Sequence, residues 1–91
     1  MIFEFDSEKN SLLKESRNIS FEEVIDEIED GTNVLDIIPH TNKERYPNQF
    51  MFIIKMKGYI YSVPFVKNEN TIFFKTIFPD RKLLKKYNFN S

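Results

Sequence analysis

Three runs of apolar, aromatic and β-branched residues follow one another in the second half of the chain, and they constrain the fold more than any other feature. They are FMFIIKMK, YIYSVPFV and TIFFKTIF, at residues 50–57, 59–66 and 71–78. Gly58 separates the first two runs, and the polar segment KNEN separates the second from the third. Runs of this kind, bounded by turn residues, are typical of strands, and strands joined by short turns pair antiparallel. The sequence therefore predicts three neighbouring antiparallel strands.

The turns also predict which side chains share a face of this sheet. If Met56 opposes Tyr59 and Val66 opposes Thr71, one face collects the apolar side chains of a core. These are Phe50, Phe52, Ile54, Met56, Tyr59, Tyr61, Val63, Phe65, Ile72, Phe74 and Phe78. The opposite face is mixed and carries Met51, Ile53, Lys55, Lys57, Ile60, Ser62, Pro64, Phe73, Lys75 and Ile77. Pro64 donates no ladder hydrogen bond, so we expect a bulge or an unpaired position there, and a slip of one residue would exchange the faces.

Caps and hydrophobic spacing place two helices in the first half of the chain. IFEF alternates apolar and acidic residues, as a short strand does, and a mostly polar helix is predicted over residues 7–17. Ser20 and Glu23 then form a capping box in front of an apolar stripe. Gly31 stands where helices commonly end, so we expect a second helix over residues 21–30.

A strand, a long loop and a last helix complete the chain. VLDII reads as a strand, and PHTNKERYPNQ reads as a loop because two prolines interrupt any periodicity. Pro79 and Asp80 begin a short helix that has Leu83, Leu84 and Tyr87 on one side. The predicted order is β-α-α-β-β-β-β-α. It is an α+β fold in which helices cover one face of an antiparallel sheet, in a single domain over residues 1–91.

The composition excludes several kinds of site. The chain has no cysteine, one histidine and two glycines, so it has no thiolate zinc site, no multi-histidine metal site and no glycine-rich phosphate loop. We therefore expect neither a metal nor a cofactor. The longest apolar stretch, FMFII, is far shorter than the roughly 20 residues of a membrane helix, and no leader-like segment opens the chain. We expect a cytoplasmic protein with no membrane partner.

Charge is divided unevenly along the chain. Residues 1–45 hold five bases and twelve acids, whereas residues 46–91 hold eight bases and two acids. Such asymmetry is typical of a protein with an acidic and a basic face, and a basic face is a candidate site for a polyanion. The alternative is that the two halves of the sequence do not become two faces in space.

Three basic stretches are candidates for chemistry, and each has a simpler explanation. The mixed sheet face interleaves lysines with Phe73, which suits phosphates and stacked bases, but a half-solvated face would look alike. His40 could transfer a proton near neutral pH, with Arg45 and Tyr46 in the same loop, or it could be a surface residue. The bases of the last helix could bind RNA or could simply be solvated near the helix end. The acidic stretch EEVIDEIED is read as a solvated face.

Several stretches resemble the BrnT family of bacterial toxins, which are small relatives of the RelE-like ribonuclease fold. The matching pieces are FEFDSEKN, ISFEEV, the loop with His40 and Glu44-Arg45, and TIFPDRKLLKKY, in the order found in the family. They extend from Phe3 to Tyr87. The resemblance implies the toxin of a type II toxin-antitoxin system, which cleaves free or ribosome-bound messenger RNA and is inhibited by a DNA-binding antitoxin.

The resemblance also implies roles for particular residues. The chemistry needs no metal, because a base removes the 2′-OH proton, the oxygen attacks phosphorus, and cations stabilise the charge. His40 would be the acid or base, and Arg45, Lys75 and Arg81 would hold the phosphate. Lys82 and Lys55 would position RNA, and Tyr46 and Tyr87 would stack on a base or donate a proton. The alternatives are a non-catalytic RNA- or protein-binding module with a toxin-like fold and a small structural protein that assembles through its charge asymmetry.

Overall fold

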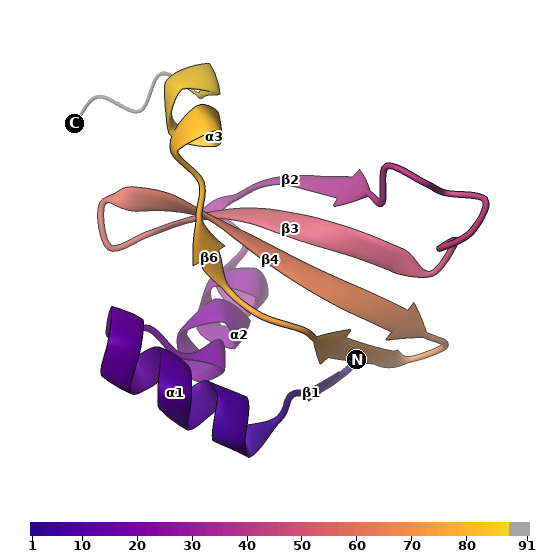
Figure 1. Ribbon diagram of the computed structural model, residues 1–91, viewed down its shortest axis with the longest axis horizontal. Coiled ribbons are helices and arrows are strands. Elements are labelled where there is room, and N and C mark those ends of the chain that lie inside the picture. Colours follow the sequence, from indigo (N-terminus) through magenta and orange to yellow (C-terminus); the bar gives the residue numbers. More distant parts are fainter. Residues whose placement is uncertain (88–91) are drawn as a thin grey trace.

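The computed structural model describes residues 1–87 and has an α+β fold, as expected (Figure 1). The elements, in chain order, are β1 (Ile2–Glu4), α1 (Ser7–Arg17), α2 (Phe21–Asp30), β2 (Val34–Pro39), β3 (Gln49–Met56), β4 (Tyr59–Asn68), β5 (Thr71–Phe74), β6 (Phe78–Pro79) and α3 (Arg81–Lys86). This order differs from the prediction in one respect, because the last predicted strand is divided into β5 and β6. No helix in the described part of the chain is long and apolar enough to cross a membrane.

The two N-terminal helices begin and end where their caps predict. The Asp6 side chain accepts the backbone N–H groups at the start of α1. Ser20 and Glu23 form the full capping box of α2, and Gly31 ends that helix with a φ of 83°. A left-handed backbone of this kind is tolerated best by glycine, which explains the sharp end of α2.

The β3–β4 hairpin has the predicted register. Met56 lies opposite Tyr59, and the pairing continues to Gln49 opposite Val66. In the next hairpin β4 extends two residues further than predicted, because Asn68 and not Val66 lies opposite Thr71, and the pairing partners shift by two residues. A displacement of two residues leaves every side chain on its predicted face, since side chains alternate with a period of two.

The sheet is mixed, and the prediction of a purely antiparallel sheet was wrong. Its strand order is β1-β5-β4-β3-β2, with β6 paired beside β4, and β1 runs parallel to β5. The ring of Phe3 stacks on that of Phe74 with their centroids 5.7 Å apart. Burial of Phe3 beside Phe74 thus draws β1 to an edge that lies far along the sequence, which short-range turn rules do not predict.

One extra residue between β5 and β6 exchanges the predicted sheet faces of Ile77 and Phe78. Phe65 lies opposite Phe74, but Ser62 lies opposite Phe78, so four steps along the last segment match three steps along β4. The irregularity lies at Pro64, where one was expected, and the Lys75 N–H donates to the Pro64 carbonyl at 2.8 Å. As a result Ile77 is 0% exposed within the core, whereas Phe78 turns to the opposite face.

The core lies between the sheet and the helices α1 and α2. It is a cluster of buried apolar side chains from both helices and from one face of the sheet. Its members are Leu13, Ile19, Phe21, Val24, Phe52, Ile54, Met56, Val63, Phe65, Ile72, Phe74 and Ile77. Asn10, also buried, joins the two helices, because its side chain accepts the Phe21 N–H and donates to Glu22, both at 2.8 Å.

Helix α3 lies on the other face of the sheet, which corrects the expectation that all helices cover one face (Figure 1). A row of paired residues on that face runs through Asp36, Ile53, Ser62 and Phe78. Hydrogen bonds join the two ends of α3 to two residues of this row, Ser62 and Asp36. The Ser62 hydroxyl donates to Asp80 at 3.4 Å, and the Tyr87 hydroxyl donates to Asp36 at 3.3 Å.

Leu83 and Leu84 of α3 are accordingly absent from the core cluster. Ile53, Ile60 and Ser62 are fully buried although they lie on the face away from that core. The physical reason is the extra residue before β6, because it turns Phe78 to this face, and the chain then enters α3 from there. The sheet is therefore covered by α1 and α2 on one side and by α3 on part of the other.

Candidate functional site

The part of the sheet face that α3 leaves uncovered contains a hollow of about 590 Å³, which we call the His40 hollow. It is lined by Ile38, Pro39, His40, Thr41, Gln49, Phe50, Met51, Pro64, Lys75 and Thr76. Ile38, Met51 and Pro64 form one paired row across its floor, and His40 and Gln49 meet two residues further along β2 and β3. The hollow therefore combines an apolar floor with polar side chains from the loop after β2 and from the segment after β5.

His40 is held at the rim by two hydrogen bonds. Its backbone N–H donates to the Gln49 carbonyl at 3.0 Å, which continues the β2–β3 ladder by one residue. The ring atom Nδ1 accepts the backbone N–H of Asn42 at 2.9 Å. Because a neutral imidazole has one donor and one acceptor, the proton of the neutral ring lies on Nε2. His40 can thus donate a hydrogen bond from Nε2 to a phosphate.

Arg45 and Tyr46 join His40 through ring contacts. The Tyr46 ring lies 4.5 Å from the His40 ring between centroids, and the Arg45 guanidinium lies 5.5 Å from the centre of the Tyr46 ring. The loop that carries them is folded around Asn42, whose side chain accepts the Arg45 N–H and whose carbonyl accepts the Tyr46 N–H. The sequence signal for Asn42 is its preference for turns, but it had not been assigned to the site.

Lys75 approaches the same hollow from the segment after β5. Its side-chain amine donates to Gln49 Oε1 at 3.4 Å, across the intervening strand β4. Phe73 lies two residues earlier on the same face and is 41% exposed. The predicted interleaving of a lysine with an exposed aromatic ring is therefore present beside the hollow. Gln49, which contacts several of these groups, was missed because it closes a segment read as loop.

Four of the predicted site residues lie outside this group: Lys55, Arg81, Lys82 and Tyr87. Arg81 and Lys82 are exposed on α3, and Lys55 is six positions from Gln49 along β3, which corresponds to about 20 Å of strand. None of the three lines the His40 hollow. The sequence could not show this separation, because it depends on which face of the sheet α3 covers and on where it begins.

Tyr87 connects the end of α3 to β2. Its hydroxyl is bonded to Asp36 on β2, and the Lys86 amine lies 5.6 Å from its ring centre. Burial raises the pKa of Tyr87, and the nearby negative charge of Asp36 raises it further. Tyr87 thus holds the end of α3 against β2 and does not reach the hollow with a free hydroxyl.

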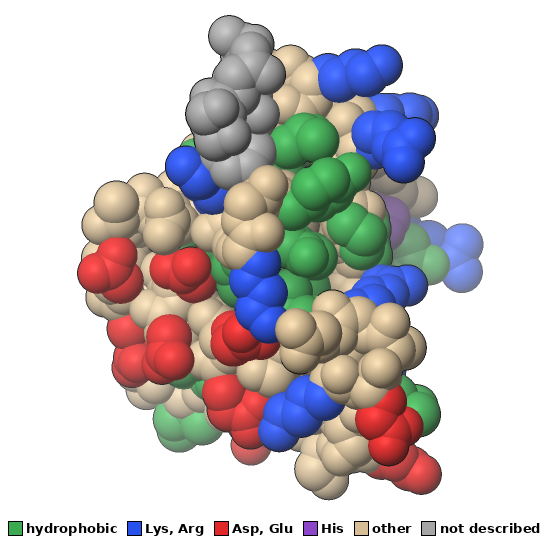
Figure 2. Space-filling view, turned by 90° about the vertical axis from the view of Figure 1, so that its left-hand side faces the viewer, with side chains coloured by type: hydrophobic (Ala, Val, Ile, Leu, Met, Phe, Trp, Pro, Cys, Tyr) green, Lys and Arg blue, Asp and Glu red, His purple; other side chains and the backbone are tan. Residues whose placement is uncertain are grey.

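The charge asymmetry of the sequence corresponds in part to a separation of acidic and basic side chains on the surface. In Figure 2, Asp and Glu side chains gather over the lower half of the face shown, and Lys and Arg side chains dominate its upper right. The view is rotated about the vertical axis, so the lower half corresponds to α1 and α2 and the upper part to α3. Helix α2 carries six acids and no base. The acids therefore gather on α2 and the bases on α3, which lie on opposite faces of the sheet, whereas α1 carries both.

Comparison with known proteins identifies no relative. No family model, no curated protein and no solved structure matches this chain. Within residues 1–87, no group of three or more His, Asp or Glu side chains is placed to hold a metal ion. The residues around the His40 hollow are therefore the basis for proposing a function.

Proposed function

We propose that this chain is the toxin of a bacterial type II toxin-antitoxin system, similar to BrnT toxins, and that it is a metal-independent endoribonuclease. Its partners would be messenger RNA, free or ribosome-bound, and a DNA-binding antitoxin. One observation carries the proposal. His40 and Lys75, which belong to two segments far apart in sequence, line a single hollow, and Tyr46 and Arg45 adjoin it through ring contacts that begin at His40. Cations beside an exposed aromatic ring suit a single-stranded nucleic acid.

In this proposal the hollow holds the phosphate at which RNA is cut. The 2′-oxygen loses its proton to Nε2 of His40 and bonds to phosphorus, while the bond to the 5′-oxygen breaks and that oxygen takes up a proton from water. Lys75 and Arg45 stabilise the negative charge that develops on the phosphoryl oxygens. The products are a 2′,3′-cyclic phosphate and a 5′-hydroxyl.

A second candidate is favoured by the hydrogen bond at His40. For His40 to accept a proton at Nε2, the neutral ring must carry its own proton at Nδ1, and that position already accepts the Asn42 N–H. Proton transfer therefore requires this hydrogen bond to open. A chain in which it stays closed would bind RNA without cutting it, which defines the second candidate as a non-catalytic RNA-binding module.

The two candidates are separated by incubating the purified chain with fluorescent single-stranded RNA, with a chelator present. Parallel reactions contain the 2′-deoxy analogue, which has no attacking oxygen. We expect cleavage of RNA alone and loss of cleavage in His40→Ala, Arg45→Ala and Lys75→Ala. Lys67→Ala is the matched control, because Lys67 lies opposite Ile72 on the other face of the sheet.

Each other result has a defined meaning. Cleavage that is unchanged in both His40→Ala and Arg45→Ala would refute the site and indicate a contaminating nuclease. Binding that requires Lys75 but produces no cut, on free or ribosome-bound message, would support the non-catalytic module. The absence of both binding and cleavage would contradict both candidates.

A further inference from the structure

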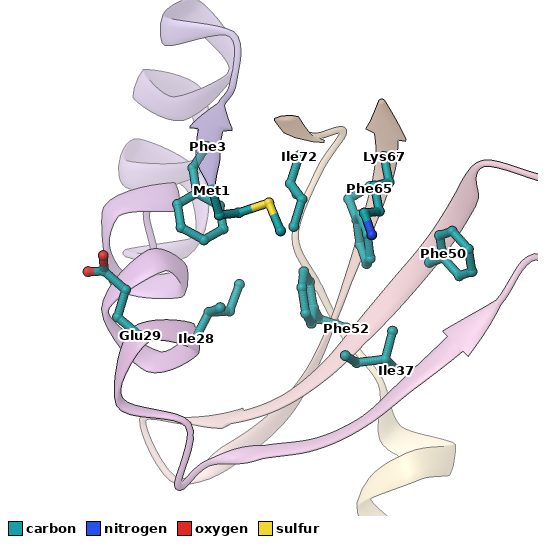
Figure 3. Close-up of a pocket in the computed structure, with 10 residues that line it drawn as sticks. All are labelled: Met1, Phe3, Ile28, Glu29, Ile37, Phe50, Phe52, Phe65, Lys67 and Ile72. Atoms are coloured by element: carbon teal, nitrogen blue, oxygen red, sulfur yellow. The ribbon is translucent and has the colours of Figure 1, made fainter. Parts of the chain in front are cut away.

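A second hollow lies on the core face of the sheet, on the other side of β3 and β4 from the His40 hollow (Figure 3). We call it the Phe65 groove. It has a volume of about 620 Å³ and is lined by Met1, Phe3, Ile28, Glu29, Ile37, Phe50, Phe52, Phe65, Lys67 and Ile72. It begins where α2 ends, so part of the apolar face of the sheet is left without a covering helix.

The floor of the groove is a row of stacked aromatic rings. The Phe65 ring lies between those of Phe50 and Phe52, with centroid distances of 5.6 and 4.3 Å. Ile28 of α2 forms one wall and Ile37 of β2 forms the other (Figure 3). Ile37 is 53% exposed, although it lies opposite the buried Phe52. Phe50 is half-buried, and Phe52 and Phe65 are buried at the base of the groove, so the surface offered to a partner is an apolar hollow with an exposed rim at Ile37.

The two charged side chains of the groove come from different elements. Glu29 belongs to α2, and Lys67 lies on β4 two residues beyond Phe65 (Figure 3). No ion pair or side-chain hydrogen bond to either is found among residues 1–87. Both charges are therefore available to a partner, one negative on α2 and one positive on β4.

We propose that the Phe65 groove binds an amphipathic helix of a partner protein. The apolar side of that helix would lie on the aromatic floor through residues spaced three and four apart, and its two flanks would carry opposite charges. A base on one flank would pair with Glu29, and an acid on the other would pair with Lys67. This charge complementarity sets the kind of helix that fits, because a helix with like charges on both flanks would meet repulsion at Glu29 or at Lys67.

Two other kinds of occupant fit less well. A small ligand is usually fixed by a few polar groups that point into its pocket, whereas the charged groups here lie at the edge of an apolar floor. A second copy of the chain would need a spare amphipathic helix. In the part of the chain that the structure describes, α1 and α2 already contribute to the core and α3 is bonded to Asp36 and Ser62.

This proposal does not depend on the proposed ribonuclease function, because the two hollows open on opposite faces of the sheet. Phe50 lines both, so it is unsuitable for a test. Ile37 is suitable, since it lines the Phe65 groove and not the His40 hollow. A partner helix and an RNA strand could therefore be bound together, and loss of one need not affect the other.

The test uses a fluorescent synthetic helix of about four turns with leucines at positions i, i+3, i+4 and i+7. Lysines occupy one flank of this mixed-charge peptide and glutamates the other. Fluorescence anisotropy with the full chain should show saturable binding that Ile37→Asp weakens at least about tenfold, because a buried carboxylate would face the floor. Ile2→Asp is the matched control, since Ile2 is also a strand isoleucine that is 53% exposed and does not line the groove.

A charge test remains valid even if Ile37→Asp fails to fold, because Glu29 is exposed. Glu29→Lys should weaken the mixed-charge peptide about fivefold and should strengthen binding of a peptide with glutamates on both flanks. Equal binding of the mixed peptide to wild type, Ile37→Asp and Glu29→Lys would overturn the proposal. Binding of a small ligand such as laurate, without binding of the peptide, would also overturn it. So would the formation of wild-type dimers that Ile37→Asp abolishes.

Discussion

Gln49 connects three parts of the His40 hollow through separate atoms. Its backbone N–H donates to the Tyr46 carbonyl at 3.2 Å, and its carbonyl accepts the His40 N–H. Its side-chain oxygen accepts from the Lys75 amine. The backbone bonds hold the loop and do not depend on the side chain in Gln49→Ala, whereas the side-chain bond restricts only Lys75. Gln49 is therefore a positioning residue that acts through Lys75.

The first prediction tests this dependence by measuring RNA affinity. Gln49→Ala should weaken binding about threefold and Lys75→Ala about tenfold, because the free lysine keeps its charge but loses its fixed direction. The double variant should bind no more weakly than Lys75→Ala alone. Anisotropy titrations at a single salt concentration measure all three. Losses that multiply in the double variant would show that Gln49 contacts RNA directly.

Helix α3 has only six residues, and its position depends on contacts at its two ends. Asp80 accepts the Leu83 N–H as the N-cap and also accepts the Ser62 hydroxyl. Tyr87 at the other end donates to Asp36. A helix this short is marginal by itself, so these end contacts keep Ile53 and Ile60 covered.

The second prediction concerns the Tyr87 end of α3. Tyr87→Phe should lower the free energy of unfolding by about 0.5–1 kcal/mol at neutral pH, because the hydrogen bond to Asp36 is lost. The pKa of Tyr87 is raised in the folded chain, so the contribution of its hydroxyl is complete below the ordinary pKa of 10.0 and is lost as pH rises through the folded value. Urea unfolding at neutral and alkaline pH should show the difference shrinking. A difference that stays constant would contradict this assignment.

The joint between α1 and α2 depends on Asn10. Its side chain serves a buried backbone N–H at Phe21 and the carboxylate of Glu22. The hydrogen bond from Asn10 is the main reason that the pKa of Glu22 is lowered, and the charge of Lys14 adds to it. One polar side chain thus fixes where the second helix begins relative to the first.

The third prediction is that Asn10→Ala lowers the free energy of unfolding by about 1–3 kcal/mol, since the Phe21 N–H is left buried without a partner. Because the pKa of Glu22 is lowered on folding, its contribution is present above the ordinary value of 4.5 and is lost as pH falls through the folded value. The variant should therefore lose less stability than wild type on acidification. Asn33→Ala is the matched control, because Asn33 also donates to a glutamate, Glu27, but serves no buried N–H. An equal loss in both variants would contradict the prediction.

For the whole molecule, the separation of Lys55, Arg81 and Lys82 from the hollow makes a prediction about salt. Each phosphate contact on single-stranded nucleic acid changes the slope of log binding constant against log salt by about −0.7. Contacts from Arg45 and Lys75 alone should give a slope of about −1.4, which Lys75→Ala should reduce by about half. Titrations over a range of salt concentrations measure it. A slope near −3.5 would mean that all five bases contact one RNA strand.

The parts of the fold that the sequence predicted are those set by nearby residues. The start and end of α2 were predicted correctly from the capping box of Ser20 and Glu23 and from Gly31. The hairpin that pairs Met56 with Tyr59 was predicted correctly from Gly58. These features depend on contacts within a few positions of one another. The extra residue before β6 was not predictable in its effect, because Pro64 indicates an irregularity but not its direction.

The candidate site was predictable to a similar extent. His40, Arg45 and Tyr46 share one loop, so their proximity follows from sequence. Lys75 joins them only because β5 pairs beside β4, which the hairpin rules also predicted. The position of α3 depends on a change of face at Phe78, and one residue of register therefore decided which bases lie near His40.

The parallel pairing of β1 with β5 also has a consequence for synthesis on the ribosome. Ile2 pairs with Thr71, so about 70 further residues must be synthesised after β1 before β5 is available for pairing. During that time α1 and α2 can form by local contacts, but Phe3 has no Phe74 ring to stack on. Contacts so distant in sequence slow folding. The residues of β1 are thus made before α1 and α2 but reach their final place only after β5 has been made.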